Sequence, residues 1–220
     1  FQGGERFAVR GCALRAGNVD DAERFWCSTA AGIDAVTTVP VSRWDHDAYF
    51  VDDPESWKLT KVNVRHCSMI DGIELFDARF FRISPAEAKG CDPLQRHILE
   101  VGYAALASAG RTQKTLLQSL TAVYVGTHLS EFNMIDSGPS ESGGCEQRAA
   151  GTGTAGSIMS NRFSFIFGMM GPSVTIDVDG ASALAAIEAG CVALDEVKRN
   201  ATLSSCTGAC TILTPLTWLV

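Results

Sequence analysis

The sequence predicts an α/β fold, because two kinds of segment alternate along it. Short runs rich in β-branched residues, such as Thr121–Val125 and Ser173–Ile176, favour strands. Longer runs with apolar residues at helical spacing, such as Asp92–Ala109 and Ala181–Lys198, favour helices. With 46% hydrophobic and 20% charged residues in 220, the composition is that of a folded domain covering residues 1–220.

The other expected elements continue this alternation. Further strands are expected at 7–9, 201–203 and 210–213, and further helices at 20–31 and 155–167. Between the first helix and the second half of the chain, residues 36–77 are rich in Trp, Asp, Pro and Tyr and show little periodicity. This segment predicts an irregular excursion packed on the surface of the sheet.

The helix expected at Ala181–Leu194 is apolar or small on every face, with Glu188 as its one charge. A helix that is apolar all round needs structure on both sides, so an isolated chain is expected to expose part of it. The edge of the strand at Val174 is expected to be open as well. The predicted association interface is Ser173, Val174, Ile176, Leu184, Ile187 and Glu188.

Charge argues against two classes of partner. The net charge of -7 and the pI near 5.1 exclude the clustered Lys and Arg that bind nucleic acid. The uncharged run from Asn200 to Val220 contains Ser, Thr, Gly and Pro, which favours buried strands over a membrane span. We therefore expect neither a nucleic-acid partner nor an integral membrane protein.

Neither the cysteines nor the glycine-rich motif predicts a metal site or a cofactor site. The eight cysteines lack the C-x-x-C pairs of zinc sites, so we expect small buried thiols in a reducing compartment. Residues 151–156 satisfy the G-x-G-x-x-G pattern, but no hydrophobic strand precedes them, which disfavours dinucleotide binding. The chain starts at Phe1 rather than Met, which allows a processed organellar protein, for example of a plastid.

Several motifs follow one another in a specific order. They are Ala8–Arg15, Phe76–Ala88, Asp92–Arg96, Ser160–Phe165 and Gly168–Asp177. In this order they resemble the ketosynthase domain of modular polyketide synthases, over essentially the whole chain. The resemblance implies the N-terminal half of a thiolase-like αβαβα fold, with a five-stranded mixed sheet and helices on both faces. It also implies that the strand at 173–177 pairs across a dimer twofold, and that a second half covers the helix at 181–194.

The departure from the family lies in the nucleophile-elbow region, 173–198. The resemblance implies a cysteine after the strand ending at Asp177, and Gly180 stands at that position. Glycine has no atom to acylate, and Asp179 beside it suits an N-cap while repelling a developing oxyanion. Ser182 is the one imaginable substitute nucleophile, but no base and orienting group are recognisable for it. We expect no catalytic residue here.

The family's second requirement, a histidine pair with a lysine, falls after the stretch that this chain matches. None of the four histidines, His46, His66, His97 and His128, fits those motifs. The preferred hypothesis is an inactive ketosynthase-like structural or interaction subunit. The alternatives are a chain-length-factor-like partner of an active condensing enzyme and a fragment of a decarboxylating ketosynthase. Expected partners are a second copy, a ketosynthase second half or a larger complex, with an acyl carrier protein as a further candidate.

Overall fold

The structure is a computed structural model that describes residues 7–17, 19–128, 130, 132, 152–195 and 202–212. The chain divides into two compact units. The sheet unit comprises Phe1–Ala13 and Glu74–Ile212, and the smaller unit comprises Leu14–Ile73 with Leu213–Val220. Among the described residues, no helix has the length and apolar character that crossing a bilayer requires.

The sheet unit is built on three parallel strands in the order β4-β3-β5. They are β3 (Thr121–Thr127), β4 (Ser173–Asp177) and β5 (Ser204–Cys210). Every residue of the central strand β3 is buried, as expected for a strand covered on both faces. This order makes β4 and β5 the two edges of the described sheet.

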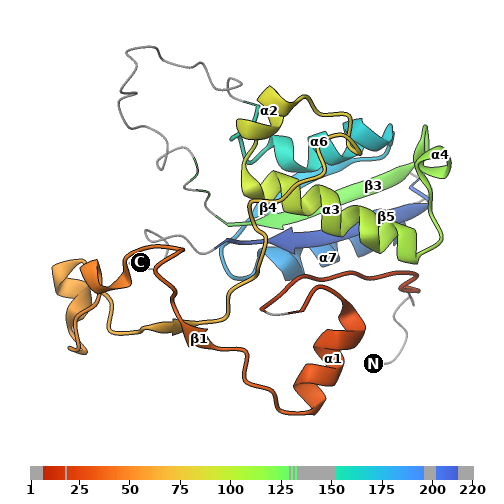
Figure 1. Cartoon of the computed structure of the whole chain (residues 1–220). Helices are drawn as coiled ribbons and strands as arrows, with labels where there is room; N and C mark the ends of the chain where they lie inside the picture. The colour runs from red at the N-terminus through yellow and green to blue at the C-terminus, as the bar shows by residue number, and fades with distance from the viewer. Residues whose placement is uncertain are drawn as a thin grey trace. The chain divides into compact units, whose positions relative to one another are not determined.

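Helices cover both faces of this sheet (Figure 1). On one face lie α3 (Pro93–Ser108) and α6 (Ile158–Phe167), and on the other lies α7 (Ser182–Asp195). The unit also contains the short helices α2 (Pro85–Lys89) and α4 (Gln113–Leu116). The expected α/β architecture with helices on both faces is confirmed.

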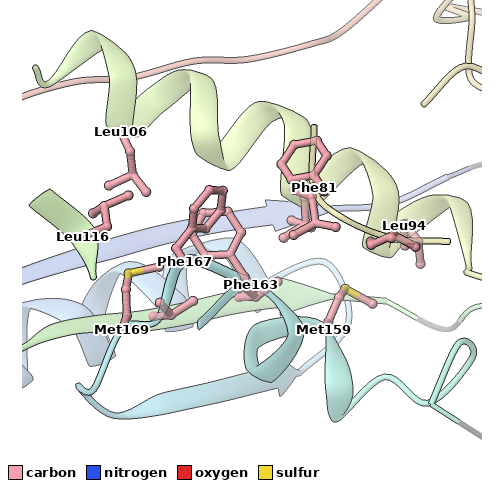
Figure 2. Close-up of a cluster of buried hydrophobic side chains, with 13 residues drawn as sticks. Phe81, Leu94, Leu106, Leu116, Met159, Phe163, Phe167 and Met169 are labelled. Carbon is pink, nitrogen blue, oxygen red and sulfur yellow. The ribbon is translucent and has the colours of Figure 1, made fainter. Parts of the chain in front are cut away.

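The larger apolar core lies between α3, α6 and the sheet (Figure 2). Phe163 and Phe167 of α6 meet edge to face with ring centroids 5.0 Å apart, and Tyr103 of α3 stacks on Phe167 at 5.2 Å. Phe163 is 1% exposed. Gly102 of α3 faces this ring so closely that an added Cβ would lie 2.5 Å from it. The absent side chain at residue 102 therefore lets α3 and α6 approach.

Local sequence explains where the main helices begin and end. Asp92 caps α3 by accepting a hydrogen bond from the Leu94 amide at 2.8 Å, and Pro93 follows as the first helical residue. Helix α6 ends at Gly168, whose φ of 64° is left-handed. The predicted helices are confirmed to within a few residues wherever the chain is described.

Helix α6 meets the edge strand β4 through hydroxyl groups. The Ser164 hydroxyl donates to the Ser173 hydroxyl at 3.0 Å, and Thr175 donates to the Ser160 hydroxyl at 3.0 Å. The pairs join residues four apart on the helix to residues two apart on the strand, which is the spacing of one helix face and one strand face. We refer to these four residues as the hydroxyl ladder.

Three strand predictions are wrong. Phe7–Val9 is irregular and lies in neither sheet of the described residues, and Val9 is 86% exposed. The separate strands expected at 201–203 and 210–213 are replaced by one strand, β5, at 204–210. Backbone pairing with a neighbouring strand stabilises a strand more than β-branched residues do, and β5 pairs with β3 over its whole length. Within the described residues the main sheet has three parallel strands, so the five-stranded mixed sheet is not seen there.

The smaller unit has little regular structure. It holds α1 (Ala22–Ala30), two 3₁₀ turns (His46–Ala48 and Ser56–Leu59) and an antiparallel pair, β1 (Thr37–Thr38) with β2 (His66–Cys67). Most of the expected excursion at 36–77 falls in this unit. Its backbone there is largely irregular.

Helix α7 lies unusually close to β5 at Gly190. A Cβ there would overlap Thr207 Cγ2 and would lie 2.7 Å from Ser205 Oγ. We expect Gly190→Ala to lower the free energy of unfolding by about 1–3 kcal/mol from overpacking, even though alanine favours helix. Gly180→Ala is the matched control, because no atom lies within 4 Å of a Cβ at residue 180. Denaturant titration measures both, and an equal effect of the two variants would contradict the close approach.

Candidate functional site

The candidate site lies where the three strands end at their carboxyl edge. Thr127, the last residue of β3, is in register with Asp177 of β4 and with Cys210 of β5. The next described helix after β3 lies on one face of the sheet, while α7, which follows β4, lies on the other. In open parallel sheets, the crevice between strands whose connections diverge in this way is the usual place for a ligand.

A tight turn joins β4 to α7 at this edge. The Ser182 hydroxyl accepts a hydrogen bond from the Val178 amide at 2.9 Å and donates to the Asp179 carbonyl at 2.7 Å. The Asp179 amide donates to the Asp177 carboxylate at 3.3 Å. Asp179 adopts a φ of 57°, a left-handed conformation that aspartate tolerates better than most residues. Three side-chain hydrogen bonds therefore fix the turn, and at Gly180 an added side chain would meet open space.

The Asp179 carboxylate faces a histidine on the neighbouring strand end. Its Oδ1 lies 3.5 Å from Nδ1 of His128, the residue directly after β3. The expectation that Asp179 caps α7 is not met within the described residues, since its carboxylate faces His128 while its carbonyl receives Ser182. The reason is the left-handed backbone, which differs from the extended conformation of an N-cap residue.

The Ser182 hydroxyl is engaged within the turn, and the thiols of β5 are weakly acidic. Ser182 is 4% exposed, and its hydroxyl both donates and accepts within the turn. Cys210 ends β5 at the same edge of the sheet, but burial, with a smaller contribution from Asp92, raises the pKa of its thiol to about 12. Burial likewise raises the pKa of Cys206 to about 11. Because the thiolate is the reactive form, the raised pKa values leave little of that form near neutral pH.

The turn at residues 152–155, within the candidate phosphate motif, holds neighbouring elements together through its carbonyl groups. Carbonyl oxygens of the turn accept hydrogen bonds from the protein: the Gly153 carbonyl from the Asp92 amide at 2.8 Å, and the Thr152 carbonyl from Gln95 Nε2 at 3.2 Å. Arg162 also donates to the Thr152 carbonyl, at 3.4 Å. A phosphate cradle presents amide donors to its ligand, whereas this turn directs acceptors to its own core. Gly151, which opens the motif, lies outside the described residues.

Arg162 is the centre of these contacts. Its Nε donates to Gln95 Oε1 at 2.7 Å, and its NH1 lies 2.5 Å from Glu87 of α2. The Arg162 side chain is 8% exposed, against 41% for Glu87. The guanidinium thereby ties α2, α3 and the 152–155 turn to α6.

The residues predicted to form an interface differ in their surroundings. Leu184, Ile187 and Val174 are 72%, 50% and 42% exposed, and Glu188 is exposed as well. Ser173 and Ile176 are half-buried, in the hydroxyl ladder and against the α7 core respectively. Only one face of α7 is buried, at Ser182, Ala186, Gly190 and Ala193.

The sequence did not single out His128 or Cys210 as parts of this edge. His128 lies three residues after the strand expected at 121–125, and Cys210 begins the strand expected at 210–213, whereas in the structure it ends β5. Among the other histidines, His97 is buried in α3, away from the exposed surface. The described residues contain no group of three or more His, Cys, Asp or Glu able to hold a metal ion.

Comparison with known sequences identifies relatives over most of the chain. Residues 4–220 match the family described as "Beta-ketoacyl synthase, N-terminal domain". The chain is 37% identical over 194 residues to a phenolphthiocerol/phthiocerol polyketide synthase of Mycobacterium tuberculosis, covering 86% of this chain and 12% of that protein. It is 38% identical to the PKS-NRPS hybrid synthetase ATPKS of Aspergillus niger, covering 87% of this chain and 10% of the relative.

Solved structures give the same answer. The ketosynthase from module 6 of the bacillaene synthase of Bacillus subtilis 168 superposes with a TM-score of 0.75 at 26% identity. That match covers 95% of this chain and 32% of the solved one. The OzmH KS7 ketosynthase domain of Streptomyces albus JA3453 gives 0.77 at 27% identity, with 96% and 35% covered. The fold is therefore the thiolase-like ketosynthase fold, and this chain spans about a third of the solved chains.

Proposed function

Because the chain belongs to the beta-ketoacyl synthase N-terminal domain family, we propose that it is a ketosynthase half unable to form an acyl-enzyme, which serves as a structural or interaction subunit of a larger assembly. The observation that carries this proposal is Gly180. The family resemblance puts a nucleophilic cysteine at this position, in the turn between β4 and α7, and the residue here has no side chain.

Other described side chains support the inference that no second nucleophile takes the place of the family's cysteine. Ser182 uses its hydroxyl to hold the turn, and the two thiols of β5, Cys206 and Cys210, have pKa values raised by burial. An acyl thioester would therefore find no activated nucleophile at this edge. Condensation requires the acyl-enzyme as its first intermediate in this family.

A role in association is supported by the exposed apolar side chains. Leu184, Ile187 and Val192 of α7 are 49–72% exposed, although the helix carries few charges. Val174 adds apolar surface at the edge strand β4. Apolar surface of this kind usually marks an association site. The curated relatives are far longer than this chain, which matches 10–12% of them, so a place within a larger assembly agrees with their architecture.

The proposal is tested by incubating the native protein with an acyl thioester and locating adducts by mass spectrometry of peptides. We expect no acyl group on the peptide containing residues 177–184 in the wild type. The positive control is Gly180→Cys combined with Asp179→Asn, which supplies a thiol without the neighbouring carboxylate. Residue 180 has room for a side chain, and its φ is not left-handed. A stable adduct on the wild-type elbow peptide would overturn the proposal.

A second candidate is decarboxylation without condensation. It is favoured by the match to about a third of the solved ketosynthase chains, since the family's histidines would lie in the remaining part. An intact mass near 23.4 kDa for the native protein would exclude it. A longer polypeptide that releases carbon dioxide from a malonyl thioester would establish it.

A further inference from the structure

Asp179 brings a negative charge to the turn between β4 and α7, whereas Gly180 brings no side chain. The start of α7 carries the positive end of the helix dipole, which favours an anion. Asp179 places a carboxylate one residue away from residue 180, and consecutive Cα atoms are about 3.8 Å apart. The structure shows that this carboxylate is not turned into α7 as a cap, because its Oδ1 faces His128 at 3.5 Å.

We propose that Asp179 is a second block on acyl transfer, independent of Gly180, because its carboxylate opposes any thiolate or oxyanion formed at the elbow. This inference rests on the proposed function, in which residue 180 is the nucleophile position. Gly180 removes the reacting atom, while Asp179 removes the electrostatic stabilisation that the helix start would supply. Restoring a cysteine at residue 180 alone therefore gives a poorly reactive thiol.

His128 is the side chain that the Asp179 carboxylate faces. Its Nδ1 lies 3.5 Å from Oδ1 of that carboxylate. Replacing the carboxylate by an amide removes the negative charge at residue 179. Asparagine is the suitable replacement, because it tolerates the left-handed backbone of residue 179 as well as aspartate does.

The test measures the alkylation rate of a cysteine at residue 180 with iodoacetamide, a neutral reagent, by quantitative mass spectrometry of the elbow peptide. The full-length native protein is prepared as Gly180→Cys, alone and combined with Asp179→Asn. Because the carboxylate is 87% exposed and partly screened, we expect the double variant to react about threefold to tenfold faster at neutral pH and about 0.1 M salt. The difference should shrink at about 1 M salt, where the Debye length is about 3 Å.

Asp195→Asn in the Gly180→Cys background is the matched control. It removes the same charge at the far end of the 14-residue helix α7, about 20 Å away at 1.5 Å per residue, and should leave the rate unchanged. Equal rates with and without Asp179, or an increase of the same size at both salt concentrations, would overturn the inference. An acyl adduct on the wild type would instead overturn the proposed function and would leave these rates as they are.

Discussion

Replacing Phe163 by alanine is expected to lower the free energy of unfolding of the sheet unit by about 3–5 kcal/mol. Phe163 is 1% exposed, meets Phe167 edge to face at 5.0 Å and lies against Gly102 of α3. The alanine variant loses the transfer free energy of the ring and leaves a cavity between two helices. Neighbouring aromatic rings already pack against one another, so the space is poorly filled by relaxation.

Phe165, two residues along the same helix, provides the control for this prediction. It is 86% exposed, so Phe165→Ala should change stability by no more than about 0.5 kcal/mol. Both variants can be compared by urea or guanidinium unfolding of the native protein, followed by far-ultraviolet circular dichroism. Similar losses for the two phenylalanines would show that the described packing of α6 is incorrect.

Arg162→Met is expected to be the next most damaging change, at about 2–4 kcal/mol. Methionine keeps much of the side-chain volume but removes the donors to Gln95, Glu87 and the Thr152 carbonyl. Gln95 is 1% exposed, so its Oε1 loses its charged donor in a buried place. The partly exposed Glu87 can regain water, which keeps the loss below that of a fully buried ion pair.

Arg111→Met is the matched control in the same unit, because Arg111 is exposed and should contribute within about 0.5 kcal/mol. Arg162→Lys separates charge from geometry. Lysine retains the cation but lacks the planar fork that reaches three acceptors, so we expect it to recover only part of the loss. Full recovery by lysine would indicate that charge alone holds these elements together.

The sequence predicted the α/β architecture and the main helices because these depend on periodicity and on capping residues within one segment. The capped start of α3 at Asp92 and the glycine end of α6 at Gly168 are of this kind. The central strand β3 was predicted for the same reason, since a run of buried β-branched residues is visible locally.

Strand β5 was misplaced because its stability is not local. Residues 204–210 are Ser, Ser, Cys, Thr, Gly, Ala and Cys, which have little of the usual strand character. They form a strand because they pair with the whole of β3 and because Gly190 lets α7 approach them. The prediction shifted toward the more hydrophobic residues on each side, which left Cys210 unrecognised at the edge that holds Gly180.

At the turn between β4 and α7, the family resemblance drew attention to Gly180 and Asp179 as a hypothesis, but the sequence did not predict which residues surround them. The contact between Asp179 and His128 joins residues 51 positions apart, and it depends on the parallel register of β3 with β4. The role of Ser182 was likewise invisible in the sequence, since a serine at a helix start is compatible with several hydrogen-bonding patterns. Side-chain direction in a tight turn is decided by backbone angles such as the φ of 57° at Asp179.

The hydroxyl ladder between α6 and β4 has a consequence for recognition at the sheet edge. Apolar side chains allow a strand to slide or roll against a helix at little cost, whereas hydrogen bonds are directional and tolerate only small changes of distance and angle. Two such bonds fix the position and orientation of β4 relative to α6. A polypeptide adding to the outer side of this strand would meet a template that is already immobilised, so less conformational entropy would be lost on association.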